Sequence, residues 1–600
     1  MPKDLKILFI TLPQRGYPDK FPPYGPMAVI TSLHKAGYKE TYFYHLDVLR
    51  PKRQEAIDFI VSLRPHILGI SSPVSTAYES CRFFSLEVKK RLPDTKIILG
   101  GNLATSAEIL LRKTGVDFCV LGEGEKVCCR LFGNIGENRP INNYYSIKGL
   151  AFLDGEKFVN TGYAEQIPKE EIFNVDWNIL DAVSIKHYFP KLNELASDSV
   201  YLKYFFPNLS DGQNCQFILN DRDLANKTTG VISCSKGCVG RCTYCHRFTK
   251  GIRILPVETA INRIKDLIAR FNIGAIAFGD ECFGSSAKWL QEFCEMVKPL
   301  KLLWKVGAMR VDMVTPDIIE MMKDAGCRSI IFGMETGSER ILKVMEKKVS
   351  FEDNYKAMQW VTEAGLYTIP QLVIGMPGET PETIRETADF IARSMTLNKS
   401  QNPHEISINF AQALPGTPLY EYGRSIGKIG ATLDEEEKYL LTISDKEAAE
   451  GDTTINFTDY PRLVLLSWPK LINIIVDYSY VKKFGLQQFY KIIFSGDAYP
   501  NIFSLIRKGK FDSIFYLYPQ LSRKLKNLIL ILTVIKVFKS SGFTNVFMLL
   551  KEYLLFRILN SLKINRKSVF EYVSLRKIVE QKTGGSSLGT KEMESLRKGR

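Results

Sequence analysis

The sequence predicts an α/β protein that consists of two successive series of strands and helices, followed by a helical C-terminal region. Strand-like and helix-like patterns alternate over residues 5–130 and again over residues 229–415. Such alternation is typical of parallel sheets covered by helices. Residues 430–600 instead show apolar stripes at helical spacing. A chain of 600 residues exceeds one ordinary hydrophobic core, so about two to four domains are expected.

The first series predicts a doubly wound parallel sheet. Its strands are expected at Ile7–Thr11, Glu40–Tyr44, Ile67–Ser71, Lys96–Leu99 and Phe118–Leu121, with helices such as Met27–Ala36 and Ser80–Arg91 between them. Ligands bind such sheets at the carboxyl ends of the strands. Small residues there let a bulky ligand approach the backbone. The candidates are Pro23, Gly25, Ser71, Ser72, Gly100, Gly101, Gly122 and Glu123.

We interpret residues 141–226 as a connector. Ile147–Phe152 and Lys157–Thr161 flank Asp154-Gly155, which predicts a hairpin. Residues 187–226 show no clear periodicity. We therefore expect an insertion or linker there, with Cys215 as an isolated thiol and without an assigned function.

The second series contains six expected strands with helices between them. The strands are Gly230–Ser233, Ala275–Gly279, Leu303–Ala308, Ser329–Met334, Thr368–Ile374 and Glu405–Ala411. The helices include Val257–Phe271, Trp289–Val297, Pro316–Asp324 and Phe351–Ala364.

A loop with three cysteines follows the first strand of this series. Cys238, Cys242 and Cys245 stand in a Cys-x3-Cys-x2-Cys pattern, and Gly237 and Gly240 let the backbone wrap closely around whatever the sulfurs hold. Soft thiolates select zinc, copper(I) or iron–sulfur clusters. A structural zinc site is closed by four ligands. Three cysteines, in contrast, leave one iron of a four-iron cluster open to a substrate or cofactor.

Two alternatives concern the neighbouring residues. Cys234 or His246 as a fourth ligand would make the loop a zinc knuckle, although no second cysteine pair is present. Cys282 lies beside a turn that is expected to bind a ligand, and it either approaches substrate or is simply packed.

The cysteine loop resembles the signature of radical S-adenosylmethionine (SAM) enzymes, and Tyr244 matches the aromatic residue of that signature. The resemblance implies a partial (β/α)6 barrel. It also implies a [4Fe-4S] cluster on Cys238, Cys242 and Cys245, whose open iron chelates SAM. An electron from the cluster then cleaves SAM to a 5′-deoxyadenosyl radical.

Segments that follow the later strands also resemble motifs of this family, as expected for catalytic groups in barrels. The resemblance implies SAM contacts by Gly279, Asp280, Glu281, Glu335, Gly375 and Pro377. The first three would lie near the amino group of SAM, and Glu335 would accept its hydrogen bonds. The last two would line the adenine. Arg310 suits the SAM carboxylate or a substrate anion, or it forms a surface ion pair.

The N-terminal series resembles the cobalamin-binding domain that precedes the radical domain in one large subgroup, so cobalamin is an expected cofactor. No Asp-x-His-x-x-Gly motif is present to supply a cobalt ligand from below. His34 and His45 lack the right flanking residues, and we expect them to be surface or partly packed residues.

The other N-terminal cysteines bear on an alternative function. Cys81, Cys119, Cys128 and Cys129 form no convincing second set of cluster ligands. This argues against a methylthiotransferase, which needs a three-cysteine N-terminal cluster in place of cobalamin.

The C-terminal region is strongly basic. Residues 501–600 contain 20 Lys and Arg and 6 Asp and Glu, whereas the first 500 residues are nearly neutral. Helices are expected at Glu435–Leu441, Leu463–Ile475, Gln487–Ile493, Leu521–Phe538 and Phe543–Leu562. They could cover the open side of the barrel or lie on an anionic membrane surface. Nucleic acid is a further candidate, but no reader motif supports it.

The expected organisation is a cobalamin-binding domain (1–140), the connector (141–226), the radical SAM barrel (227–430), a basic helical domain (431–582) and a disordered tail (583–600). No cleavable signal pattern is visible, so we expect a cytoplasmic enzyme, with peripheral membrane contact as an option. An electron donor such as flavodoxin or ferredoxin is an expected partner.

The resemblance implies C-methylation of an unactivated carbon in a small molecule or lipid. Relatives of this kind also catalyse cyclisation or oxidative rearrangement. A cobalamin-binding regulatory protein without turnover is the non-enzymatic alternative.

Overall fold

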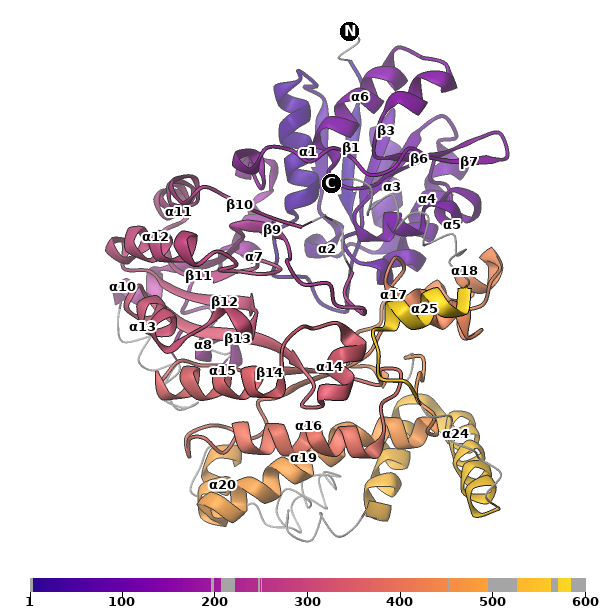
Figure 1. Cartoon of the computed structure of the whole chain (residues 1–600). Helices are drawn as coiled ribbons and strands as arrows, with labels where there is room; N and C mark the ends of the chain where they lie inside the picture. Colours follow the sequence, from indigo (N-terminus) through magenta and orange to yellow (C-terminus); the bar gives the residue numbers. More distant parts are fainter. Residues whose placement is uncertain are drawn as a thin grey trace.

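The computed structural model describes residues 4–195, 199–206, 222–246, 249, 251–451, 454–494, 526–562 and 570–583. The expected isolated thiol at Cys215 and all but the first residue of the expected disordered tail lie outside these residues. Figure 1 shows the N-terminal sheet at one end of the molecule and the C-terminal helices α19 (Arg462–Phe484) and α24 (Lys526–Ser561) at the other, with the second sheet between them.

The N-terminal domain is the doubly wound sheet that the sequence predicts. Its parallel strands run in the order β2-β1-β3-β4-β5. They are β1 (Ile7–Thr11), β2 (Thr41–Tyr44), β3 (Ile67–Ser71), β4 (Lys96–Gly100) and β5 (Phe118–Val120). The predicted hairpin, β6 (Leu150–Asp154) and β7 (Lys157–Asn160), pairs antiparallel with β5 and extends this sheet.

Helices cover both faces of the N-terminal sheet, because apolar side chains alternate between the two faces of each strand. Ile7 and Phe9 pack with α1 (Tyr24–Lys35) and α6 (Gly124–Gly136). Leu8 and Ile10 face the other helices. These are α3 (Arg53–Leu63), α4 (Tyr78–Arg91) and α5 (Ala107–Lys113).

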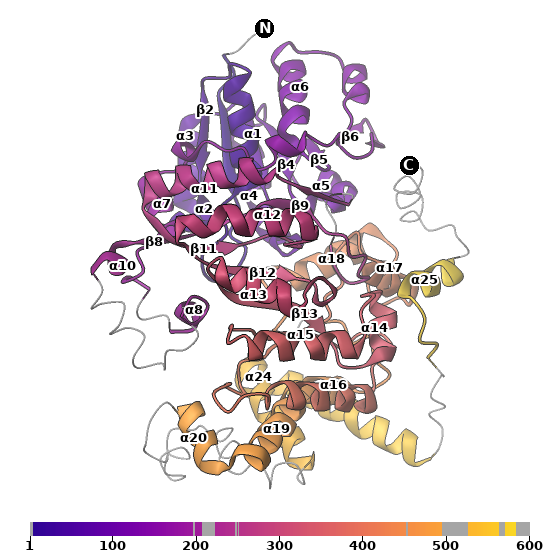
Figure 2. The ribbon, with the colours of Figure 1, turned by 60° about the vertical axis from the view of Figure 1, so that its left-hand side comes forward.

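The second sheet is a six-stranded partial barrel, which confirms the expected fold. Its strands are all parallel and follow each other in sequence order. They are β8 (Thr228–Ile232), β11 (Ile273–Phe278), β12 (Leu303–Met309), β13 (Cys327–Glu335), β14 (Pro370–Ile374) and β15 (Ser407–Phe410). The outer helices are α11 (Val257–Phe271), α12 (Ala287–Val297), α13 (Pro316–Asp324), α14 (Glu339–Met345), α15 (Phe351–Glu363) and α16 (Pro381–Ser394). Figure 2 shows several of them stacked along one side.

The connector enters the inner face of the barrel. Leu202 of α8 (Ser199–Lys203) and Phe205 pack against Ala275 and Ala277 of β11, whereas Ile276 on the opposite face packs toward the outer helices. Part of the segment without periodicity therefore fills the barrel interior, and its apolar residues contribute to a small core of their own.

The C-terminal helices correct two expectations. Two of these helices, α19 and α24, cover the outside of the barrel rather than its open side, because α19 packs on α16 and α24 packs on α19. The two long helices expected at Leu521–Phe538 and Phe543–Leu562 form the single helix α24 over its described range. Ser540-Ser541-Gly542 does not end it, since side chains on both sides of this segment pack together in one apolar cluster. The remaining C-terminal helices are α17 (Pro418–Ser425), α18 (Leu433–Ile443), α20 (Leu486–Phe494) and α25 (Leu575–Thr583). None of the described helices meets the length and hydropathy needed to cross a membrane.

Candidate functional site

The cysteine loop begins at the carboxyl end of β8 and is closed by a small hairpin. Its strands, β9 (Ser235–Gly237) and β10 (Ile252–Ile254), pair antiparallel, a feature that the sequence pattern did not predict. Gly237 has a φ of +91°, and a side chain there would lie 2.2 Å from the carbonyl oxygen of Gly251. Only glycine fits this crossing of the two strands.

The cysteine sulfurs gather around a second glycine. A Cβ atom on Gly240 would lie 3.4 Å from the Sγ of Cys238 and 3.7 Å from the Sγ of Cys242. Desolvation and the negative charges of nearby groups, Cys242 and Cys238 among them, raise the pKa of the Cys245 thiol to about 12. The three thiols therefore face one region. In the described part of the chain no three His, Cys, Asp or Glu side chains can share one metal ion. A four-iron cluster takes one thiolate per iron, and this donor set fits it.

Two cations lie beside the sulfurs and favour negative charge there. The Nη1 atom of Arg310 would be 3.2 Å from the same Cβ position on Gly240. Its other nitrogens donate to the carboxylate of Asp312 at 2.9 and 2.7 Å, so a buried Arg310 forms an ion pair with an exposed Asp312 at the protein surface. Lys347, the second cation, was not identified from the sequence.

Lys347 and Glu335 form a buried ion pair with a distance of 2.8 Å. Burial lowers the pKa of Lys347, but Glu335 and the thiolate of Cys242 outweigh it and raise that pKa above its ordinary value. Glu335 ends β13 with a φ of +66°, which is unusual for a residue with a side chain and marks stored backbone strain. The hydroxyl of Tyr244 interacts with Glu335 and Cys242, so the expected aromatic residue lies in the same cluster of side chains.

The predicted SAM contacts after β11 divide into two groups. Asp280 is fully buried and accepts hydrogen bonds from the N–H groups of Cys234 and Ser235, at 3.0 and 2.5 Å. It therefore holds the start of the cysteine loop, and it does not line the cavity between the N-terminal domain and the barrel. Gly279 and Glu281 do line that cavity, and Gly279 also gives room to the ring of Phe21.

The turn after β14 faces the C-terminal region. Gly375 and Pro377 are buried, and neither lines the cavity between the N-terminal domain and the barrel. The carboxyl group of Glu379 accepts hydrogen bonds from the N–H groups of Gly375 and Met376, and burial raises its pKa to about 8. Thr380 caps α16, because its hydroxyl accepts a hydrogen bond from the N–H of Thr383. Sequence reasoning missed Glu379.

Cys234 and Cys282 lie in different environments. Cys234 is packed in the hydrophobic core, and the charged groups that act on its thiol are Asp280 and Arg263. Cys282 is also buried. Its Sγ lies 3.9 Å from the sulfur of Met313, and its interaction with the thiol of Cys238 is the largest cause that raises the pKa of Cys282.

A cavity of about 390 Å³ joins the two domains. Its N-terminal wall contains seven of the eight predicted residues: Pro23, Gly25, Ser71, Gly100, Gly101, Gly122 and Glu123. Ser72 is the exception, because it is buried and its hydroxyl donates to the carbonyl of Val74. The other wall comes from the base of the cysteine loop and the end of β11, including Ser233, Lys236 and Glu281.

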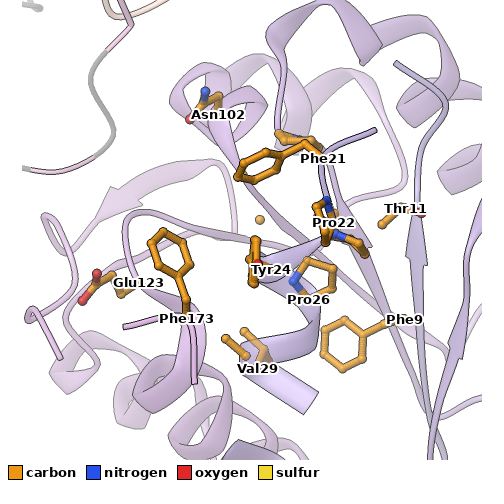
Figure 3. A pocket seen from close by; sticks show the side chains of 18 of the residues that line it. Phe9, Thr11, Phe21, Pro22, Tyr24, Pro26, Val29, Asn102, Glu123 and Phe173 are labelled. Carbon is orange, nitrogen blue, oxygen red and sulfur yellow. The ribbon is translucent and has the colours of Figure 1, made fainter. Parts of the chain in front are cut away.

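The cavity suits a large, partly apolar ligand. No atom lies within 4 Å of a Cβ built on Gly25 or Gly100, so these glycines leave open space against the backbone. Figure 3 shows the aromatic rings of Phe21, Tyr24 and Phe173 around this space, with Glu123 on one side. These features fit a B12 cofactor at the carboxyl ends of the strands.

Glu123 and His45 are both engaged by protein groups. Glu123 pairs with Lys236 and Arg253, and it accepts a hydrogen bond from the N–H of Ile167, so it ties the domains together. His45 is buried in the cavity wall, contrary to expectation, while His34 is exposed. The ring nitrogens of His45 lie 2.5 Å from the hydroxyls of Thr11 and Tyr188. Burial lowers its pKa to about 4.

The remaining N-terminal cysteines are divided by the sheet. Cys81 and Cys119 are buried on the face covered by α3 and α4, whereas Cys128 is buried on the face of α1 and α6. Cys129 lies next to Cys128 on α6. The sheet therefore separates the two pairs.

Comparisons with known proteins agree with both domains. The model of the radical SAM superfamily matches residues 232–391, and that of the B12 binding domain matches residues 17–132. The anaerobic magnesium-protoporphyrin IX monomethyl ester cyclase of Cereibacter sphaeroides is 24% identical over 378 residues, which are 61% of this chain and 56% of the cyclase. An uncharacterised methyltransferase of Pyrococcus horikoshii is 25% identical over 367 residues, 60% of this chain and 69% of that protein. The chain thus spans little more than half the length of the cyclase.

Two solved structures share the fold. The radical SAM methyltransferase TsrM of Kitasatospora setae, with cobalamin and a [4Fe-4S] cluster bound, superposes with a TM-score of 0.52 at 18% identity, over 71% of this chain and 76% of TsrM. The apo form of the cobalamin-dependent radical enzyme OxsB superposes with a TM-score of 0.55 at 15% identity, over 99% of this chain and 80% of OxsB. The chain contains a radical SAM domain and a B12-binding domain, and these two domains imply cobalamin, SAM and a [4Fe-4S] cluster as cofactors.

Proposed function

We propose that the protein transfers a methyl group to an unactivated carbon of a small molecule or lipid. The observation that carries this proposal is the shared cavity, whose walls are the strand ends of the B12-binding domain and the base of the cysteine loop. When bound, SAM on the cluster supplies a carbon-centred radical and cobalamin supplies the methyl group. We propose flavodoxin or ferredoxin as the electron donor and the cytoplasm as the location.

The residues of the chain hold the reactants and exclude water. Cys238, Cys242 and Cys245 would ligate the cluster, with Arg310 and Lys347 balancing its negative charge. Phe21 and Tyr24 line the cavity, and their rings would keep the space between the two cofactors apolar. A dry site protects a radical from side reactions.

The first test is anaerobic reconstitution of the protein with iron, sulfide and a corrinoid. We expect a bound corrinoid spectrum, about four irons per chain, and 5′-deoxyadenosine from SAM. The variant with Cys238, Cys242 and Cys245 all changed to Ala should lose iron and deoxyadenosine. Retained SAM cleavage in that variant would refute the proposal.

The second test addresses the cavity. Gly100 lines the cavity and has open space around it. The variant Gly100→Leu would fill this space with a side chain, so it should displace the corrinoid while the cluster remains. Gly16→Leu is the matched control, because Gly16 also has open space around it but is exposed and does not line the cavity. Equal corrinoid binding by the two variants would contradict the cobalamin site.

A cyclase is the second candidate, since the Cereibacter sphaeroides relative carries that name. Both enzymes would produce deoxyadenosine, whereas only the methyltransferase would move an isotopic label from the methyl group of SAM to the product. A regulatory protein would produce neither.

A further inference from the structure

The outer face of helix α24 carries a continuous row of exposed apolar side chains. Phe543, Phe547, Leu550, Leu554 and Ile558 are spaced three or four residues apart, so they share one face of the helix. Their exposed fractions are 71%, 59%, 37%, 58% and 54%. Single exposed apolar residues are ordinary, but a contiguous row of this length marks a contact surface. We call these five residues the outer row.

The opposite face of α24 already packs against the protein. Val546 and Leu549 are buried and form a cluster with Leu466 of α19. The ring of Phe556 lies 6.0 Å from that of Tyr460. The outer row is therefore not needed to hold α24 in place.

The charges around the outer row are positive. Lys536, Lys539, Lys551 and Arg557 are all exposed. The one carboxylate in the sequence of α24 belongs to Glu552, which accepts a hydrogen bond from the N–H of Arg462 and so serves the contact with α19. The surface thus combines a large apolar area with cations that no acid on the helix offsets.

We propose that the outer face of α24 docks on the surface of an anionic lipid bilayer. The bilayer offers an apolar interior to the outer row and negative headgroups to the lysines and Arg557, whose long side chains reach the headgroup level. The charge of the surface favours this occupant over a second copy of the chain, because two copies would bring like charges together. The inference goes beyond the proposed function, since docking requires no catalysis.

The experiment is flotation of the reconstituted holoenzyme with lipid vesicles. Vesicles of phosphatidylcholine with about one third phosphatidylglycerol should carry the protein, whereas pure phosphatidylcholine vesicles should carry at least fivefold less. The double variant Phe547→Glu/Leu554→Glu should reduce flotation with the anionic vesicles at least fivefold. Its iron content, deoxyadenosine formation and melting temperature should match the wild type, because both side chains are exposed.

Phe59→Glu is the matched control, because Phe59 is 44% exposed on α3 of the N-terminal domain. This variant should float like the wild type. The variant Lys551→Gln/Arg557→Gln should bind both kinds of vesicle equally weakly. Flotation of the double glutamate variant at the wild-type level would overturn the proposal. A second outcome would also overturn it: the wild-type protein does not float, light scattering shows a dimer, and the double glutamate variant is a monomer. The occupant of the outer face would then be a second copy of the chain.

Discussion

The guanidinium of Arg576 donates a hydrogen bond to the carbonyl oxygen of Arg241, 3.0 Å away in the cysteine loop. The same side chain forms an ion pair with Glu346 at the end of α14, and Ser574 donates to that carboxylate as well. The loop is also bound to α14 directly, because the N–H of Thr243 donates to the carbonyl of Met345 at 2.8 Å. Helix α25 therefore braces the cluster loop from a position more than 300 residues away.

Arg576→Ala should weaken cluster retention and stability. The substitution leaves the carboxylate of Glu346 without its cation, and loss of a charged hydrogen bond costs about 1.5–3 kcal/mol. We expect faster loss of iron to a chelator and a lower midpoint in anaerobic urea unfolding. Lys577→Ala is the control, because Lys577 is exposed on the same helix. Identical iron loss from the two variants would show that α25 does not brace the loop.

Cys282→Ala should retain the cluster. Although Cys282 interacts with the thiol of Cys238, three cysteines suffice for the proposed cluster with its open iron. Removal of one buried sulfur should cost only about 1 kcal/mol of stability. We expect about four irons per chain and deoxyadenosine formation within a fewfold of wild type, whereas Cys238→Ala should lose both. If Cys282→Ala loses iron as fully as Cys238→Ala, the cluster has a fourth protein ligand and the proposed SAM chemistry fails.

Variants of the Glu335–Lys347 ion pair distinguish its effect on the free energy of unfolding from its effect on SAM cleavage. Lys347→Met leaves a buried carboxylate without its partner, which should cost about 3–5 kcal/mol of unfolding free energy. Adding Glu335→Gln should recover most of that stability, because no buried charge then remains. Deoxyadenosine formation should stay low in the double variant, since both side chains adjoin the cysteine sulfurs. Recovery of stability together with wild-type activity would restrict the pair to a structural role.

The sequence predicted what short-range pattern determines. Apolar strands between amphipathic helices predicted both sheets, and the spacing of Cys238, Cys242 and Cys245 predicted a loop on which the three sulfurs face one region. Side chains supplied from distant segments left no such pattern. Lys347 reaches Glu335 only because the chain turns back after α14, and Arg576 reaches Arg241 across 335 residues. Asp280 belongs to a segment that predicted a SAM contact, but its buried oxygens accept hydrogen bonds from the backbone of the cysteine loop instead of facing the cavity.

Lys305 should make stability depend on alkaline pH. Its ammonium group lies 3.5 Å from the ring centre of Tyr204 on the inner face of the barrel, and burial and the charge of Lys20 lower its pKa to about 8. The ordinary lysine pKa is 10.5. Between these values the unfolded chain binds the proton and the folded protein does not, so this group makes stability rise with pH over that window. At neutral pH the partly buried charge opposes folding.

Lys305→Met removes this linkage. We expect the variant to be more stable than wild type at pH 7.5, by on the order of 2 kcal/mol, and the difference to shrink toward zero at pH 10. Anaerobic urea unfolding at both pH values measures it. Lys301→Met serves as the control, because Lys301 is an exposed lysine two residues before β12 and its substitution should change stability equally at both pH values. If the stability difference between Lys305→Met and wild type does not vary with pH, the pKa of Lys305 is not lowered in the folded protein. An anionic group inside the barrel would then balance its positive charge.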